Sequence, residues 1–207
     1  MMAWVANGGL RYGALVAQEA KESLHHAEPG CDGTWGELVV QRGLDPGINI
    51  GGCGLCEVLI EDGLPRRWGD PFKAFVGDVQ GQEPDFSGYG VYYPPIATAA
   101  ARLGAHAEGR TGWTVAEIED QIRAGNPVVV WLDSSFRVLQ PGHWTAWDGV
   151  DVPYIVGEHA VTVMGFDDSA GTITVVDVLR GELHSFSTST FAAILTTFGG
   201  MGVAVSG

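Results

Sequence analysis

The stretch that decides the fold is residues 158–178, which read EHAVTVMGFDDSAGTITVVDV. It holds two apolar runs, Ala160–Phe166 and Thr172–Val178, that are rich in the β-branched residues that favour strands. The segment between them, Asp167–Gly171, has the Asp, Ser and Gly residues of a turn. The stretch therefore predicts two strands paired as an antiparallel hairpin.

Each strand of this hairpin carries one residue that is unusual beside apolar neighbours, His159 on the first and Asp177 on the second. A carboxylate in an apolar strand is costly unless it is paired. If Phe166 faces Thr172, then His159 faces Leu179 and lies diagonally from Asp177 on the same face, with backbones about 7–8 Å apart. A slip of one residue puts the two on opposite faces. Two interpretations stay open here: a functional pair, or a structural His and a strand-end Asp.

Strands predominate after this point in the chain and helices before it. Further strands are predicted at Val128–Leu132, His184–Ser187 and Gly202–Val205, with a helix at Thr190–Phe198. Helices are predicted earlier at Gly13–Leu24, Asp32–Arg42, Leu55–Glu61, from Pro94 to Gly104, and from the capping box Thr114–Glu117 to Gly125. This order predicts an α+β fold in a single domain, 1–207, with a helical part at about 1–125 and an antiparallel sheet part at about 126–207.

The composition of the chain argues against two classes of function, nucleic-acid binding and membrane attachment. The chain has 207 residues, of which 45% are hydrophobic, and a formal net charge of −14. That charge repels phosphate backbones and anionic bilayers, so neither nucleic-acid binding nor membrane attachment is expected. Apolar runs such as Val128–Leu132 are too short to insert in a membrane. The N-terminus lacks the charged start and apolar core of a signal peptide, which leaves a cytoplasmic chain or export by another route or after leader removal.

Of the three cysteines, Cys31 has the most suggestive position. It stands just before the predicted helix Asp32–Arg42, and a helix N-terminus favours the negative charge of a thiolate. The alternative is a small buried apolar residue. Cys53 and Cys56 supply only half of a zinc site, and no second ligand pair follows, so we expect no metal and interpret both as packing residues. A Cys at a helix start with a His and an Asp on adjacent strands is the arrangement of a cysteine peptidase.

Four segments then resemble a known family. The chain looks like a papain-like cysteine peptidase of the group that includes the bacteriocin double-glycine leader peptidases, in its broad C39-like branch. The segments are Pro29-Gly30-Cys31-Asp32-Gly33-Thr34 at the catalytic helix, Trp68–Gly77 with Gly88–Ile96 in the central loop, Gly125–Trp131, and Gly157–Val161 with Asp177 and Gly181. Together they cover about residues 29–205.

The resemblance implies a papain-like fold in which Cys31 is the nucleophile, His159 the general base and Asp177 the residue that orients the base, with no cofactor. Two positions depart from the family pattern: Asp32 follows the cysteine where Glu is frequent, and Val178 follows the aspartate where Pro is frequent. Papain-like enzymes usually carry an oxyanion Gln about six residues before the Cys, and here that place holds His25. An imidazole also donates a hydrogen bond, so His25 is a candidate replacement.

The resemblance implies hydrolysis of a peptide or isopeptide bond through a thioester. The substrate of the protein is then expected to be a peptide or a cell-wall peptide. Two alternatives are a catalytically weak or inactive binding module of the same fold, which the His25 position favours, and a cell-wall amidase or endopeptidase, including a phage lytic enzyme.

Overall fold

The structure is a computed structural model that describes residues 2–4, 58–78 and 81–207. The predicted helices Gly13–Leu24 and Asp32–Arg42 lie outside the described residues. So do His25 and the three cysteines, Cys31, Cys53 and Cys56.

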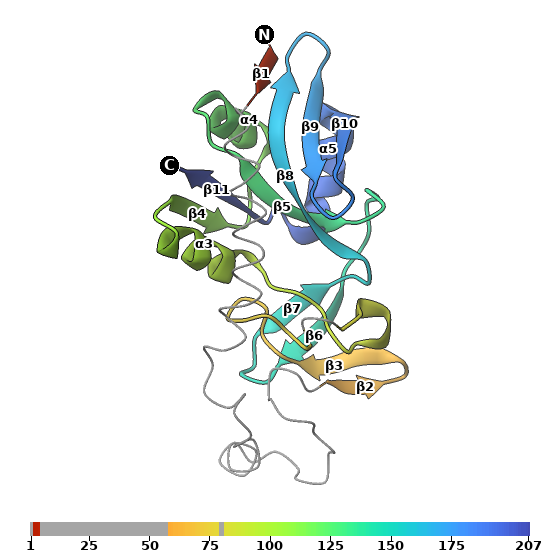
Figure 1. Cartoon of the computed structure of the whole chain (residues 1–207). Coiled ribbons are helices and arrows are strands. Elements are labelled where there is room, and N and C mark those ends of the chain that lie inside the picture. The colour runs from red at the N-terminus through yellow and green to blue at the C-terminus, as the bar shows by residue number, and fades with distance from the viewer. Residues whose placement is uncertain (1, 5–57, 79–80) are drawn as a thin grey trace.

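The larger of two sheets has seven strands and contains the predicted hairpin (Figure 1). Its main path runs β10-β9-β8-β5-β11-β4, and β1 also pairs with β8. The bounds of these strands are β1 Met2–Trp4, β4 His106–Arg110, β5 Val128–Asp133, β8 Glu158–Asp167, β9 Thr172–Asp177, β10 Glu182–Ser187 and β11 Gly202–Ser206. Every pairing within this sheet is antiparallel. The strands predicted after residue 125 are thus confirmed.

A smaller sheet of four strands lies at the other end of the molecule (Figure 1). Its order is β2 Leu59–Glu61, β3 Leu64–Trp68, β6 Gly142–Ala146 and β7 Asp151–Tyr154. The chain passes from β7 to β8 through a short bend at residues 155–157, so β8 begins where the two sheets meet. His159 is the second residue of β8 and therefore stands at this junction.

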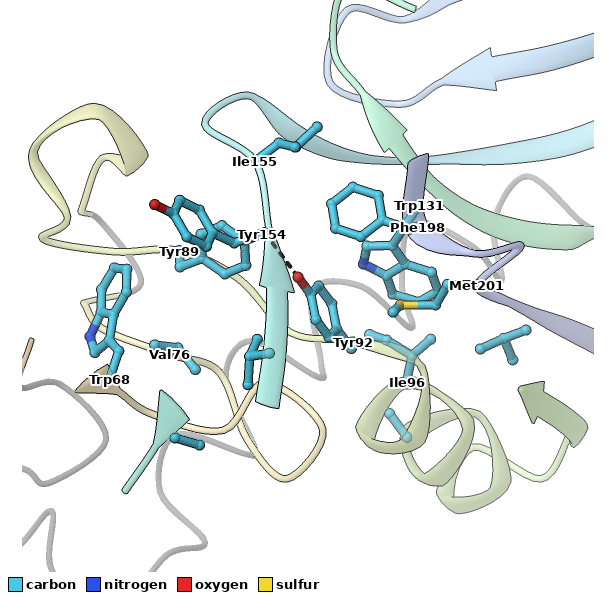
Figure 2. Packing of buried hydrophobic residues seen from close by; sticks show 14 of the residues in the cluster. Trp68, Val76, Tyr89, Tyr92, Ile96, Trp131, Tyr154, Ile155, Phe198 and Met201 are labelled. Carbon is cyan, nitrogen blue, oxygen red and sulfur yellow. Dashed lines mark hydrogen bonds between the residues drawn. The ribbon is translucent and has the colours of Figure 1, made fainter. Parts of the chain in front are cut away.

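Strand β5, with the sequence VVVWLD, is almost continuously apolar because both of its faces are buried. Val128, Val130 and Leu132 join one core cluster, which also contains side chains of α4 and α5. Trp131 belongs to a second cluster, toward the small sheet, and Val129 packs against it. Since side chains alternate along a strand, burial on both faces demands apolar residues at every position. The second cluster is rich in aromatic rings: Trp68, Phe86, Tyr89, Tyr92, Trp131, Trp144, Tyr154 and Phe198. Figure 2 shows six of these rings, those of Trp68, Tyr89, Tyr92, Trp131, Tyr154 and Phe198.

Three α-helices are described, and their positions agree with the sequence signals. Helix α3, Tyr93–Arg102, has proline in its first turn. Helix α4, Val115–Arg123, begins with the predicted capping box, in which Thr114 and Glu117 bond each other's backbone amides. Helix α5, Thr188–Leu195, is followed by a short 3-10 turn, η2 Thr196–Phe198. None of the helices in the described residues is long and apolar enough to span a membrane.

The part of the chain before residue 126 contains more strand than predicted. The predicted helix Leu55–Glu61 is wrong over its described end, because Leu59–Glu61 is strand β2. A turn at Asp62 and Gly63, both with positive φ, leads from β2 directly into β3, which pairs with it. The chain therefore forms a hairpin here and not a helix. Strand β4 lies between α3 and α4 and joins the large sheet. The described architecture is therefore mixed α and β, with strands in both parts of the chain.

Candidate active site

The register of the β8–β9 hairpin decides whether His159 and Asp177 share a face. Near the turn, Phe166 pairs with Ile173 and not with Thr172, so the predicted register is wrong there by one residue. A β-bulge between Val163 and Gly165 then shifts the pairing, and beyond it Val163 faces Val175. The bulge restores the predicted register for the rest of the hairpin, because it adds one unpaired residue to β8. His159 and Asp177 consequently lie on the same face.

The two side chains form a direct hydrogen-bonded pair. The distance from His159 Nε2 to Asp177 Oδ1 is 2.9 Å. The side chain of His159 is 11% exposed and that of Asp177 is 0% exposed. A buried carboxylate held against one nitrogen fixes both the orientation and the tautomer of the ring.

The turn that follows β9 fixes the side chain of Asp177. Its Oδ1 accepts the backbone amides of Leu179 and Arg180, and its Oδ2 accepts Arg180 Nη1 at 2.7 Å. Burial alone raises the pKa of Asp177, but the hydrogen bonds from Arg180 and from His159 outweigh it and lower this pKa to about 2. Asp177 is thus a carboxylate at neutral pH, suited to stabilise a protonated imidazole.

Since Nε2 of His159 is hydrogen-bonded to Asp177, Nδ1 is the ring nitrogen that can bind or release a proton. Within the described part of the chain, the only hydrogen bond of this ring is the one from Nε2. His159 lines a cavity of about 640 Å³. Apolar side chains such as Phe75, Ile96 and Trp131 form part of the wall, and Glu83 and Glu158 add carboxylates near the histidine. A His–Asp pair beside a cavity of this size is an arrangement that can place a general base next to a bound substrate.

Glu83 is a further residue of this cavity, and the sequence alone does not point to it. It lies on the 3-10 turn η1, Glu83–Asp85, and its Oε2 accepts the backbone amides of Gly157 and Glu158, at 2.5 and 2.9 Å. Burial, with a smaller contribution from the charge of Asp133, raises the pKa of Glu83 to about 7 even though both amide hydrogen bonds oppose the shift. A Gln-Glu-Pro-Asp run in a loop carries no distinctive signal, so only the fold reveals this contact.

The described residues hold no group of three or more His, Cys, Asp or Glu side chains arranged to bind a metal ion. His159 and Asp177 are the predicted site residues that the structure brings together. Cys31 and His25 lie outside the described residues, so their positions relative to this pair stay predictions.

The described fold combines a mainly antiparallel sheet with a buried His–Asp pair whose histidine lines a cavity. The model of the peptidase C39-like family matches residues 50–202. The chain therefore belongs to the peptidase C39-like family, a membership that indicates cysteine peptidase activity.

A solved structure supports this assignment. The chain is similar to a crystal structure described as that of a "putative C39-like peptidase" from Bacillus anthracis, with 26% identity, a TM-score of 0.58 and coverage of 72% of each chain. No curated protein matches the chain. The family match includes His159, Asp177, Cys53 and Cys56, and it begins after Cys31.

Proposed function

We propose that the protein is a cysteine peptidase that hydrolyses peptide or isopeptide bonds through Cys31, His159 and Asp177 and a thioester intermediate. The observation that carries the proposal is the buried hydrogen bond between His159 and Asp177, beside the cavity in a C39-like peptidase. A positioned base that is itself oriented by a carboxylate is what activation of a thiol requires.

The proposed reaction begins with proton transfer from the thiol of Cys31 to Nδ1 of His159, while Nε2 stays bonded to Asp177. The thiolate attacks the carbonyl carbon of the scissile bond, and the imidazolium protonates the leaving amine as the C–N bond breaks. Water, deprotonated by the neutral imidazole, then attacks the thioester. The acid product leaves and the thiol is regenerated, so the cycle consumes one water and needs no cofactor.

We further propose that Cys31 and His25 belong to a papain-like arrangement in which the His25 imidazole donates a hydrogen bond to the oxyanion. Loss of one oxyanion donor costs about 2.7–4 kcal/mol of transition-state stabilisation. Replacement of His25 by Gln is therefore expected to keep turnover, and replacement by Ala to lower it about 10²–10³-fold with little change in KM. Wild-type turnover in His25→Ala would remove His25 from the site.

The substrate class is best identified by exposing the protein to a panel of peptides, isopeptides and cell-wall peptides and weighing the products by mass spectrometry. We expect cleavage products that carry one added water, and their loss in Cys31→Ala and in His159→Ala. Cys53→Ala and Cys56→Ala are the matched controls and should keep most activity. Cleavage of cell-wall peptides alone would place the protein among lytic endopeptidases. Absence of any cleavage by the folded wild type would favour a binding module and contradict the proposal.

A further inference from the structure

The contact between Glu83 and the start of β8 links a distant loop to the strand that carries His159. Glu83 is far from His159 in the sequence, yet its Oε2 accepts the amides of Gly157 and Glu158 at 2.5 and 2.9 Å. These are the two residues immediately before His159. One carboxylate oxygen thus holds the backbone from which the histidine side chain projects.

The loop that carries Glu83 is anchored on its own side. Phe86, which adopts a left-handed conformation with φ 54°, is buried and makes an edge contact with Trp68 at 6.0 Å between ring centroids. The amide of Tyr89 donates to the carbonyl of Val76, and the amide of Val76 donates to the carbonyl of Gly90. Because these contacts anchor the loop to the aromatic core, they also fix the backbone that carries Glu83.

The backbone at Gly157, which Glu83 binds through its amide, also makes a hydrogen bond to the chain just after β5. The carbonyl of Gly157 accepts the amide of Ser134, at 2.8 Å, just beyond the end of β5. Gly157 has φ +95°, and a Cβ there would meet Asp133 Oδ1 and Ser134 Oγ at 3.3 Å. The bend before β8 therefore has one defined conformation, fixed between the end of β5 and Glu83.

We propose that Glu83 is a positioning residue, whose carboxylate fixes the bend before β8 and thereby sets the place of the His159 ring. The inference rests on the proposed function, in which His159 is the base. Glu83 acts through the backbone and exchanges no proton with the substrate. A displacement of about 1 Å in a catalytic group costs up to about 100-fold in rate, so this support matters for turnover more than for substrate binding.

The strength of the contact depends on the charge of Glu83. Burial, with help from Asp133, raises its pKa to about 7, so Glu83 changes charge near neutral pH. Asp133 at the end of β5, which is itself paired with Arg137, acts on this pKa. The charge of Glu83 in turn acts on Tyr89 and Tyr92. The other titratable or charged residues that line the same cavity are Glu158, His159 and Arg180. A carboxylate accepts amide hydrogen bonds more strongly than the protonated acid does. Burial outweighs this gain: because folding raises the pKa of Glu83 from 4.5 to about 7, the stability that Glu83 contributes is complete below about pH 4.5 and is lost as the pH rises through about 7.

The kinetic test compares Glu83→Ala and Glu83→Gln with Asp85→Asn, an exposed acid on the same turn, as the matched control. Glu83→Ala should lower kcat about 10- to 100-fold and leave KM within about twofold. Glu83→Gln should retain kcat at neutral pH, because its amide oxygen still accepts both amides, and it should lose the part of the pH profile that titrates near 7. Equal kcat in Glu83→Ala and Asp85→Asn would overturn the proposal.

The structural test uses nuclear magnetic resonance and does not depend on activity. The Gly157 and Glu158 amide resonances should titrate with a midpoint near pH 7 in the wild type and not in Glu83→Gln, and the His159 ring resonances should move in Glu83→Ala. Unchanged His159 resonances in a folded Glu83→Ala, or Gly157 and Glu158 amides that titrate alike in wild type and Glu83→Gln, would overturn it. If the Ala variant does not fold, the Gln comparison decides. If the wild type cleaves nothing, the proposed function fails while these resonances still test Glu83.

Discussion

Asp177 is the residue whose role is best defined by its contacts. It is fully buried, it binds His159, and it accepts hydrogen bonds from the side chain and backbone of Arg180. Every one of these partners donates a hydrogen, so the carboxylate is saturated by donors in its ionised form. We therefore expect its charge, and not only its shape, to matter.

Replacement of Asp177 by Asn tests this charge through activity. The amide can still hydrogen-bond, but it cannot stabilise the imidazolium and can select the wrong ring tautomer. We therefore expect kcat to fall by about 10²- to 10⁴-fold. Steady-state kinetics on a cleaved peptide measures the loss. Asp168→Asn is the matched control, because Asp168 lies in the hairpin turn and forms an exposed ion pair with Arg123. Equal losses in the two variants would contradict the assigned role.

Acid stability tests the same charge without substrate. The pKa of Asp177 falls from 3.8 to about 2 on folding, so the unfolded chain binds this proton first as the pH decreases. The stabilisation it contributes is complete above about pH 3.8 and is lost as the pH falls toward 2. Urea unfolding between pH 5 and pH 2 should therefore show a steeper loss of stability in the wild type than in Asp177→Asn. Parallel curves for the two proteins would show that folding does not lower this pKa.

At the scale of single elements, the β8–β9 hairpin shows what sequence patterns can and cannot predict. The alternation of apolar residues predicts both strands, and the turn residues predict their pairing. The register at the turn is one residue away from the predicted one, and the bulge near Met164 cancels that difference before His159 is reached. Met164 is another buried apolar residue and gives no signal of the bulge, but Gly165 beside it does, since a glycine inside a strand often marks a bulge.

The bend before β8 is the element whose backbone most directly supports the site. Gly157→Ala forces a side chain into a left-handed conformation next to Asp133 and Ser134, which should cost about 1–3 kcal/mol and displace His159. Gly171→Ala, at the far end of the hairpin, has φ +61° and open space around its Cβ. We expect both variants to lose stability in urea unfolding and only Gly157→Ala to lose kcat. Loss of activity in proportion to stability in both would contradict a special role for the bend.

Across the whole molecule, the sequence predicts the large sheet better than the small one. The central strands of the large sheet, β5, β8, β9 and β11, are largely buried and stand out as apolar runs, whereas the outer strands β4 and β10 are more exposed and more polar. The small sheet is built from short segments such as LPRRW and DVPY, whose prolines and charges give no strand signal. Its β3–β6 pairing is parallel and joins distant parts of the chain, so only the tertiary fold specifies it.

The candidate site follows the same division. His159 and Asp177 are predictable because polar residues inside an apolar hairpin need an explanation. Glu83 is not, because its partners are backbone amides brought near by the fold. The place of Cys31 before a predicted helix and the family resemblance predict that it is the nucleophile, and we propose that its thiol works with His159.

The most direct measurement of that claim is site-resolved alkylation. Wild type and His159→Ala are treated with limiting iodoacetamide at pH 7, and labelling of Cys31, Cys53 and Cys56 is quantified by peptide mass spectrometry. Because a neighbouring base promotes the thiolate, we predict that Cys31 is labelled fastest and that its rate falls about 10-fold or more in His159→Ala, while Cys53 and Cys56 label at unchanged rates. Labelling of Cys31 at the same rate in both proteins, or a loss in His159→Ala confined to Cys53 or Cys56, would contradict the account.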